Sequence, residues 1–217
     1  MKSHPLSKLG SEELVTKLCE VGRTKTFGVG EEIFRAGDKP EFLPIIIDGR
    51  LKVVRFLELG KEIILNIFSE GEMFAIPPIL DGRSYPATAI AIDETQLLLI
   101  YKNDFDLLLE SSPEFSSVVM AKMSALMRDI ASSMENLATA SPEKRVGKVL
   151  FKLATKESES GAIKITLRRQ DIAEMAGLTT ETTIREVRKL ADKDLVNIVR
   201  GKIIIEDIDS LGEFLDI

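Results

Sequence analysis

The spacing of apolar residues changes along the chain, and in the first half it predicts β-structure. Between residues 24 and 100, short apolar runs alternate with turns that contain glycine. The runs are Glu32–Phe34, Leu43–Ile47, Leu51–Phe56, Ile63–Phe68, Ala87–Ile92 and Gln96–Ile100. Short strands separated by turns about every 8–12 residues are typical of a sandwich or barrel-like roll. The dipeptide Asp48-Gly49 between two of these runs indicates a two-residue hairpin.

Helical spacing precedes and follows this β-rich segment. Residues 6–20 carry an apolar stripe of Leu14, Val15 and Leu18, which indicates one or two short helical turns. Residues 103–109 predict a short helix, and Pro113 is suited to the first turn of a longer one. In the longer helix, positions recur at alternating steps of four and three residues: Val119, Met123, Leu126, Ile130, Ser133 and Leu137.

This heptad seam, with Met127 and Met134 beside it, predicts a parallel homodimer in which the seams of two chains pack together. The alternative is that the helix packs on the β-roll of its own chain. Both arrangements can coexist, because one face of a long helix can pack on the roll while the other meets a twin helix.

A pair of short helices joined by a tight turn is predicted within residues 167–191. Gly177 can end the first helix in the left-handed conformation without steric cost. Thr179 is suited to cap the second helix by accepting a main-chain N–H. The side facing the core is expected to carry Ile172, Ala173, Ala176, Ile184, Val187, Leu190 and Ala191. The opposite face of the second helix carries Glu181, Arg185, Arg188 and Lys189.

Short β-segments flank the helix pair. Residues 163–166 form a strand-like run before it, and residues 194–205 hold two apolar runs around an Arg-Gly-Lys turn, which predicts a hairpin. A helix-turn-helix followed by a hairpin with a basic tip is a winged helix, and its tip can lie on DNA phosphates. Ser141-Pro142 is the predicted hinge before these elements, and it starts a helix to residue 154. Residues 156–161 are expected to form a polar loop.

The distribution of charge supports contact with nucleic acid. The chain has 217 residues and a net charge of −6. Residues 142–205 nevertheless hold 14 Lys and Arg against 9 Asp and Glu, whereas residues 206–217 hold 5 acidic residues and no basic one. The positive balance therefore coincides with the predicted winged helix, as the release of counterions from phosphates requires.

Composition excludes several other classes of protein. The single cysteine, Cys19, excludes an internal disulfide and an iron–sulfur cluster, which needs about four thiolates. The single histidine, His4, excludes the usual zinc sites and most histidine-dependent catalysis, so we expect no metal site, no catalytic residues and no enzyme. No apolar run approaches the roughly 18 residues of a membrane helix, and the N-terminus lacks a signal-peptide core. We therefore expect a cytoplasmic protein without a membrane partner.

Five segments, in their order and spacing, make the chain resemble the Crp/Fnr family of bacterial transcription regulators. They are Gly30–Asp38, Asp48–Val53, Glu70–Phe74, Tyr85–Ala89 and Leu167–Arg185. The resemblance implies an α+β fold with an antiparallel, jelly-roll-like β-roll that senses an effector in residues 1–110. A dimerisation helix in residues 111–138 and a winged helix-turn-helix in residues 139–217 would follow. It also implies a homodimer bound to palindromic double-stranded DNA, with RNA polymerase as a further partner.

The family resemblance also assigns DNA contacts. A Glu and an Arg four residues later read base edges in the family, and Glu181 and Arg185 match them. Catabolite-activator members carry Arg at the position of Thr180, and anaerobic regulators carry Ser at that of Ile184, so neither operator can be transferred. The expected base readers are Thr180, Glu181 and Arg185. The expected phosphate contacts are Arg168, Arg169, Gln170, Arg188, Lys189 and Lys202. The alternative for Arg188 and Lys189 is plain solvation.

The sensor region departs from the cyclic-AMP-binding members of the family. Those members carry a Glu for the ribose and an Arg-Ser pair for the phosphate. Here Ile76 takes the Glu position and Tyr85-Pro86 the pair, while Arg83-Ser84 would match only after a two-residue shift. We therefore expect an unknown small-molecule effector rather than a cyclic nucleotide, with a cyclic-nucleotide-binding regulator as an alternative. The expected pocket comprises Met73, Phe74, Ile76, Arg83, Ser84, Tyr85, Met123 and Met127, and a filled core is the alternative there.

Two further alternatives remain at the level of sequence. His4 or a methionine could ligate haem iron, which would make the protein a haem-based gas or redox sensor. The chain could also be a regulatory module that does not bind DNA, in which case the β-roll alone carries the function.

Overall fold

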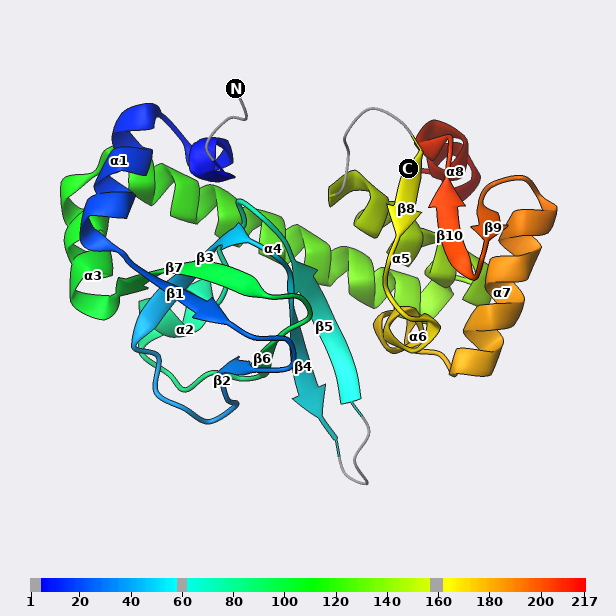
Figure 1. Ribbon diagram of the computed structural model, residues 1–217, viewed down its shortest axis with the longest axis horizontal. Coiled ribbons are helices and arrows are strands. Elements are labelled where there is room, and N and C mark those ends of the chain that lie inside the picture. The colour runs from blue at the N-terminus through cyan, green and yellow to red at the C-terminus, as the bar shows by residue number, and fades with distance from the viewer. Residues whose placement is uncertain (1–4, 58–61, 157–161) are drawn as a thin grey trace. The chain divides into compact units, whose positions relative to one another are not determined.

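The computed structural model describes residues 5–57, 62–156 and 162–217, without the side chains of residues 136–138 and 156 (Figure 1). The chain divides into two compact units, residues 1–129 (unit 1) and residues 130–217 (unit 2). The boundary between them lies within the long helix α4 (Pro113–Thr139). The predicted polar loop at residues 156–161 lies almost entirely outside the described residues, and so does His4.

Unit 1 begins with the helical turns that the apolar stripe predicts. A 3-10 helix, η1 (Pro5–Leu9), precedes α1 (Glu12–Val21). The Ser11 hydroxyl caps α1 by accepting the main-chain N–H of Leu14 at 3.2 Å. Leu14, Val15 and Leu18 are buried. The 3.6-residue period of the stripe therefore puts one side of α1 into the core.

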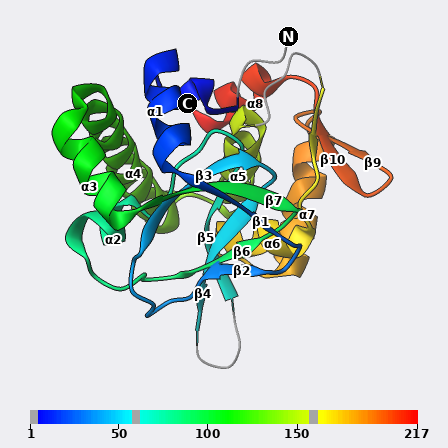
Figure 2. The same ribbon diagram turned by 60° about the vertical axis from the view of Figure 1, so that its left-hand side comes forward.

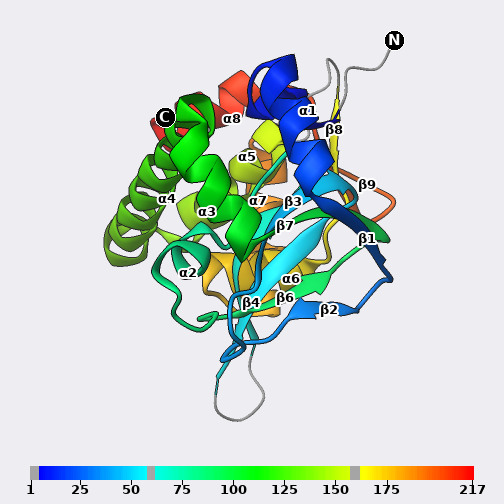
Figure 3. The ribbon, with the colours of Figure 1, turned by 90° about the vertical axis from the view of Figure 1, so that its left-hand side faces the viewer.

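The described strands of unit 1 form two antiparallel sheets. One has the order β1-β7-β3 and the other the order β2-β6-β4-β5. The bounds are β1 Arg23–Phe27, β2 Glu32–Phe34, β3 Phe42–Asp48, β4 Leu51–Phe56, β5 Glu62–Phe68, β6 Thr88–Ala91 and β7 Thr95–Tyr101. All six strands predicted from the apolar runs are present. Helices α1 and α3 lie beside the β1-β7-β3 sheet (Figures 2 and 3).

The hairpin predicted at Asp48-Gly49 is wrong. Strand β3 pairs with β7, whereas β4 pairs with β5 and β6, so the chain crosses from one sheet to the other at this point. Gly49 has a φ of +84°, and a Cβ atom there would lie 2.4 Å from the carbonyl oxygen of Glu94. Glycine is needed because the backbones of two segments approach each other closely, a requirement that a hairpin turn does not share.

Three helices complete unit 1. Helix α2 (Ile76–Asp81) was not predicted from the sequence, and it contains Pro77 and Pro78 at its first turn. Helix α3 (Lys102–Ser111) and the first half of α4 follow β7. One core cluster joins α1, β3, α3 and α4, and a second lies around the aromatic residues between the strands. The first cluster includes Leu18, Ile45, Phe105, Phe115 and Val119.

Unit 2 contains the predicted winged helix-turn-helix. Ser141 precedes helix α5 (Pro142–Lys156), and its hydroxyl accepts the N–H of Lys144 at 3.3 Å. Then follow β8 (Ile163–Ile165), α6 (Arg169–Ala176), α7 (Thr180–Asp192), β9 (Asn197–Val199), β10 (Lys202–Ile205) and α8 (Ile208–Leu215). Strand β10 lies between β8 and β9 in an antiparallel sheet. Leu167 lies in front of α6 rather than opening it, and its side chain is buried.

Candidate nucleic-acid interface

Local sequence sets the turn between α6 and α7. Gly177 takes φ +61° and ψ +41°, the left-handed conformation expected there. The N–H of Leu178 donates to Ala173 O at 2.9 Å and the N–H of Gly177 to Glu174 O at 3.3 Å. These two bonds satisfy the last carbonyl groups of α6. The Thr179 hydroxyl accepts the N–H of Thr182 at 3.2 Å, as predicted, and so begins α7.

Helix α7 presents a largely polar face to solvent. The side chains predicted on this face, Glu181, Arg185, Arg188 and Lys189, are all exposed, and so is Thr180, the third expected base reader. Ile184, which was expected to face the core, is 36% exposed and lies among them. That expectation was wrong because the inward positions are taken by Thr183 and Glu186 together with Val187 and Leu190. The helix is rotated relative to the predicted phase.

Glu186 has no counterpart in the sequence prediction. Its side chain is 3% exposed, and its carboxylate accepts hydrogen bonds from Lys189 Nζ at 2.8 and 3.0 Å and from Arg185 Nε at 3.2 Å. Burial by itself raises the pKa of Glu186, but the hydrogen bonds from Lys189 and Arg185 outweigh burial and leave the pKa below its usual range. The group is therefore an ionised carboxylate at neutral pH. The sequence held one signal for its burial. Glu186 lies three residues after Thr183 and four before Leu190, a spacing that puts all three side chains on one side of the helix.

The residues expected to contact phosphates at the start of α6 have different surroundings. Arg168 is exposed, and its guanidinium makes two bonds to the carboxylate of buried Asp171, at 2.8 and 3.0 Å. Arg169 is half-buried and donates from Nη2 to the carbonyl of Gly201 at 3.3 Å, and burial lowers the pKa of its guanidinium. Gln170 is exposed and donates to Glu174 at 2.9 Å.

The β9–β10 hairpin forms the predicted wing. Its turn places Arg200 at φ +49° and Gly201 at φ +78°, next to exposed Lys202. The bond from Arg169 to Gly201 thus joins the first residue of α6 to the tip of the wing. The structure brings the basic residues of the wing turn close to the helix-turn-helix, as a combined phosphate-contacting surface requires.

Arg145 on α5 supports the helix-turn-helix, a role that was not predicted from the sequence. Its Nη2 donates to the carbonyl groups of Ala176 and Gly177, the latter at 3.0 Å. A cation at the C-terminal end of a helix is favoured by the helix dipole. The donor and acceptors lie 31 and 32 residues apart in sequence, so periodicity could not reveal this contact.

The seam expected along α4 is divided between two environments. Val119 is 3% exposed and packs in the core of unit 1, which corrects its expected place in a dimer seam. Met123 and Leu126 are half-buried, whereas Ile130 and Ser133 are exposed. The side chain of Leu137 lies outside the described residues. Among its described side chains, the large apolar ones that α4 exposes are Ile130, which belongs to the expected seam, and Met120, Met127 and Met134, which do not.

The apolar residues expected to line an effector pocket are packed in the core of unit 1. This favours the alternative stated from sequence, a filled core in place of a pocket. Met73, Phe74, Ile76 and Tyr85 are all buried. Tyr85 stacks on Phe34 with ring centroids 3.8 Å apart, and its hydroxyl donates to Phe42 O at 3.1 Å. Burial raises the pKa of Tyr85 to about 12, so this hydroxyl is protonated at neutral pH.

The polar members of the expected pocket lie on the surface. Arg83 and Ser84 are exposed, and Arg83 Nε lies 3.8 Å from the carboxylate of Asp81. Met127 is exposed, while Met123 packs partly against the core. Among the described residues, the positions that match the cyclic-nucleotide motif, Ile76 and Tyr85-Pro86, offer no charged side chain for a ribose or a phosphate.

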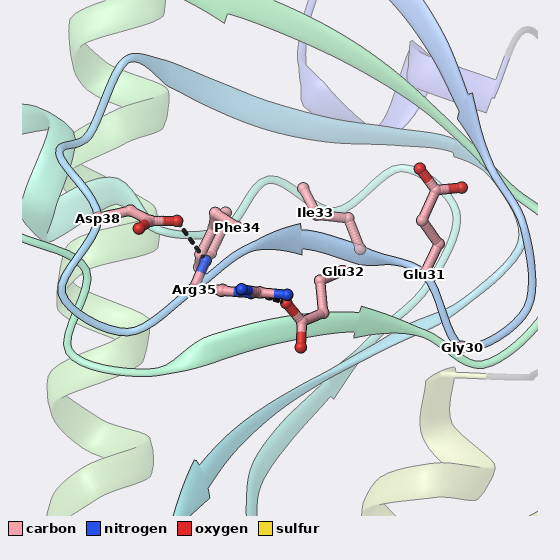
Figure 4. A pocket seen from close by; sticks show the side chains of 7 residues that line it. All are labelled: Gly30, Glu31, Glu32, Ile33, Phe34, Arg35 and Asp38. Carbon is pink, nitrogen blue, oxygen red and sulfur yellow. Dashed lines mark hydrogen bonds and ion pairs between the residues drawn. The ribbon is translucent and has the colours of Figure 1, made fainter.

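A surface hollow lies at β2 (Figure 4). It is lined by Gly30, Glu31, Glu32, Ile33, Phe34, Arg35 and Asp38. The Glu32 carboxylate pairs with Arg35, and the Asp38 carboxylate accepts the N–H of Arg35 at 2.8 Å. Glu31 accepts the N–H of Gly28 at 2.9 Å. Three carboxylates against one guanidinium disfavour an anionic ligand here.

Comparison with known proteins agrees with this arrangement. The chain matches the family model of the cyclic nucleotide-binding domain over residues 24–112 and that of the Crp-like helix-turn-helix domain over residues 144–214. It is 25% identical over 213 residues to the cyclic AMP receptor protein of Thermus thermophilus, covering 98% of this chain and 97% of that protein. It is 27% identical to the fumarate and nitrate reduction regulatory protein of Vibrio cholerae, over 85% of this chain and 74% of that protein.

Solved structures share the fold. The structure of FixK2 from Bradyrhizobium japonicum superposes with a TM-score of 0.80 at 20% identity, covering 89% of this chain and 96% of that one. The order of the two matched domains and the geometry of α6, α7 and the wing define a DNA-binding transcription regulator. The chain belongs to the Crp/Fnr family. Within the described ranges, no helix is long and apolar enough to cross a membrane.

Proposed function

We propose that this regulator binds palindromic DNA as a homodimer and answers to an effector other than a cyclic nucleotide. The observation that carries the proposal is the exposed polar face of α7, whose opposite side packs on α5 and α6. In a dimer, the two α7 helices would enter successive major grooves. The effector would shift the population of states that differ in the long helix and the hinge at Ser141-Pro142, and so in the spacing of the two α7 helices.

Base reading is assigned to the first half of α7. The Arg185 guanidinium can donate two parallel hydrogen bonds to O6 and N7 of guanine, and the Glu181 carboxylate can accept from a cytosine amino group. Thr180 is placed at the N-terminus of the helix, where a hydroxyl can bond to a base or a phosphate. These three side chains are exposed and lie within two turns of the helix start, the part that reaches base edges in helix-turn-helix proteins.

Phosphate contacts are assigned to the residues around that reading face. Arg188 is exposed one turn further along α7, and Lys189 is exposed beside it. Arg168, Gln170 and Lys202 are exposed at the start of α6 and on the wing, while Arg169 contributes by holding the wing turn. Such contacts fix the position of the protein on the duplex and carry no sequence information.

The base-reading assignment is tested by fluorescence anisotropy with a duplex selected from a randomised palindromic pool. Arg185→Ala should weaken binding to the selected duplex by about tenfold or more, because a bidentate contact to a base discriminates by about 1–3 kcal/mol. Lys164→Ala is the matched control, since it removes one positive charge from an exposed position on β8. If Arg185→Ala bound the selected duplex no worse than this control, Arg185 would not be a base reader.

The dimer is assigned to the exposed side of α4. Met120, Met127 and Met134 recur every seven residues, and Ile130 lies between two of them. A heptad repeat of apolar side chains on one exposed helix face favours packing against a second copy. Val119 and Met123 lie toward the roll. Packing on the roll and packing against a twin helix, the two alternatives stated from sequence, would therefore use two different faces of α4.

The effector is proposed to be a small molecule that does not carry a cyclic phosphate. Supporting this, Ile76 and Tyr85 are buried among apolar side chains, and Pro86 has no N–H to offer. Calorimetric titration of the protein with cyclic AMP and with cyclic GMP should give no binding heat at micromolar concentrations. Saturable binding that is abolished by Arg83→Ala would show that the loop shifts to form a phosphate site, and it would overturn this part of the proposal.

A further inference from the structure

Two carboxylates lie buried in the described part of the chain, Asp171 and Glu186. Asp171 caps the start of α6 through Arg168 and has a structural role. Glu186 is different because its partners, Arg185 and Lys189, belong to the exposed face of α7. A buried charge on the inner side of a DNA-facing helix needs an explanation, since an apolar residue there would pack without needing a charged partner.

The geometry connects the buried carboxylate to the proposed base reader. The Glu186 side chain is 3% exposed, whereas those of Arg185 and Lys189 are 67% and 51% exposed. Glu186 Oε1 accepts from Arg185 Nε at 3.2 Å, and both carboxylate oxygens accept from Lys189 Nζ. The bond to Arg185 engages only its Nε. The two terminal nitrogens of its guanidinium, which form the end-on fork that can match guanine, take no part in this bond.

A held guanidinium binds with less loss of freedom than a mobile one. An arginine side chain on a helix surface samples many rotamers, and fixing it on DNA costs conformational entropy. When Glu186 holds Nε before DNA arrives, part of that ordering has already taken place. The same carboxylate also accepts hydrogen bonds from Lys189 Nζ.

We infer that Glu186 is a positioning residue that sets the guanine preference of Arg185 without touching the DNA. This inference rests on the proposed function, because it concerns how the same α7 face discriminates between bases. Glu186 acts through Arg185, and its removal should therefore lower discrimination more than it lowers general affinity for duplex DNA.

The test compares the wild-type protein with Glu186→Gln and Arg185→Ala on three duplexes. These are the selected palindrome, the same palindrome with 7-deazaguanine in place of the contacted guanine, and an unrelated sequence. Wild-type protein should lose about tenfold in affinity on the 7-deazaguanine duplex, which lacks the N7 acceptor. Glu186→Gln should lose most of that sensitivity and about tenfold in affinity for the palindrome, while its affinity for the unrelated duplex stays equal or increases.

A double mutant separates positioning from a structural role. If Glu186 acts through Arg185, the double variant Arg185→Ala with Glu186→Gln should bind the palindrome no more weakly than Arg185→Ala alone. Losses that add would show that Glu186 supports the fold and not the arginine. Asp192→Asn is the matched control, because Asp192 is an exposed acid on the same helix and its change alters net charge equally. It should preserve both the affinity and the 7-deazaguanine effect.

The outcomes distinguish the two proposals. If wild-type protein shows no preference for any palindrome, the proposed function itself fails. If wild-type protein and Arg185→Ala behave as expected but Glu186→Gln retains the full sensitivity to 7-deazaguanine, the function stands and the inference about Glu186 is overturned. Should Glu186→Gln not fold, Glu186→Leu takes its place in the same assays, because an apolar side chain needs no partner at that buried position.

Discussion

Gly49 and Gly82 show how the surroundings of one residue decide its role. Both have positive φ angles, +84° and +72°, which L-residues rarely adopt. A Cβ atom at Gly82 would meet nothing within 4 Å. At Gly49 it would lie 2.4 Å from Glu94 O and 2.8 Å from Thr95 Cα, both of which are backbone atoms. Backbone atoms cannot move aside as the end of a side chain can. Of these two positions, Gly49 therefore requires glycine because of close contact as well as conformation, whereas Gly82 requires it because of conformation alone.

This difference predicts unequal effects of alanine at the two glycines. Gly82→Ala should lower the free energy of unfolding by about 1–2 kcal/mol through backbone strain alone. Gly49→Ala adds a clash, which costs about 1–3 kcal/mol more by analogy with overpacking. Thermal or denaturant unfolding of both variants measures the difference. Equal losses would mean that the crossing between the sheets can open without cost at Gly49.

The two buried carboxylates differ from the exposed ion pairs at the same scale. Lys17 and Glu13 on α1 pair at 2.7 Å, yet both side chains are largely exposed. An exposed pair of this kind contributes little to stability because water screens it. Glu186 and Asp171 are buried, and leaving either carboxylate without its partners would cost the desolvation of an ionised group.

At the scale of elements, α6 and α7 depend on a contact from α5. Arg145 donates to the Ala176 and Gly177 carbonyl groups, where α6 ends and the turn begins. Helix α5 also packs on α6, α7 and α8. The orientation of α7 therefore depends on a side chain that lies outside the helix-turn-helix segment itself.

Arg145→Met should destabilise unit 2 by about 2 kcal/mol, because it removes charge-assisted hydrogen bonds and leaves the partly buried carbonyl group of Ala176 unpaired. Lys144→Met is the matched control on the same helix. Its ion pair with Asp216, at 2.5 Å, is exposed and should contribute less than about 1 kcal/mol. Urea unfolding followed by circular dichroism gives both values. A loss for Arg145→Met no larger than that of the control would show that the turn is stable without this contact.

At the scale of the whole molecule, α4 belongs to both units. Its first half packs on the roll through Phe115 and Val119. Its exposed side carries three methionines, Met120, Met127 and Met134, which extend over both halves of the helix. A regulator that reads two half-sites needs its two α7 helices at a fixed distance. In the proposed dimer, a paired α4 would supply that constraint.

Met127→Glu should therefore dissociate the dimer. Each buried methionine contributes about 1.5–3 kcal/mol, and a symmetric dimer contains two copies, so the dissociation constant should rise at least about 100-fold. Sedimentation velocity at micromolar concentration measures this shift. Val29→Glu is the control, since Val29 is also exposed but lies in the turn between β1 and β2. A wild-type protein that sediments as one chain would contradict the dimer.

The sequence by itself determined most of the strands and helices, though not α2, and where the helix-turn-helix lies. These features depend on near neighbours along the chain: the apolar period, the left-handed Gly177 and the Thr179 cap. It also located the positive charge, because charge is counted from residues alone. The same local rules assigned Glu181, Arg185 and Arg188 to the outer face of α7, where the structure places them.

Only the tertiary structure decided which surfaces are buried against which. It made Asp48-Gly49 a crossing between sheets, turned Ile184 outward and Glu186 inward, and placed Val119 on the roll so that Met120 and Met127 face solvent. Each of these outcomes depends on contacts between residues far apart in sequence. Turning a helix about its own axis leaves the spacing of its apolar residues along the sequence unchanged. It does exchange the side chains that are buried for those that remain exposed.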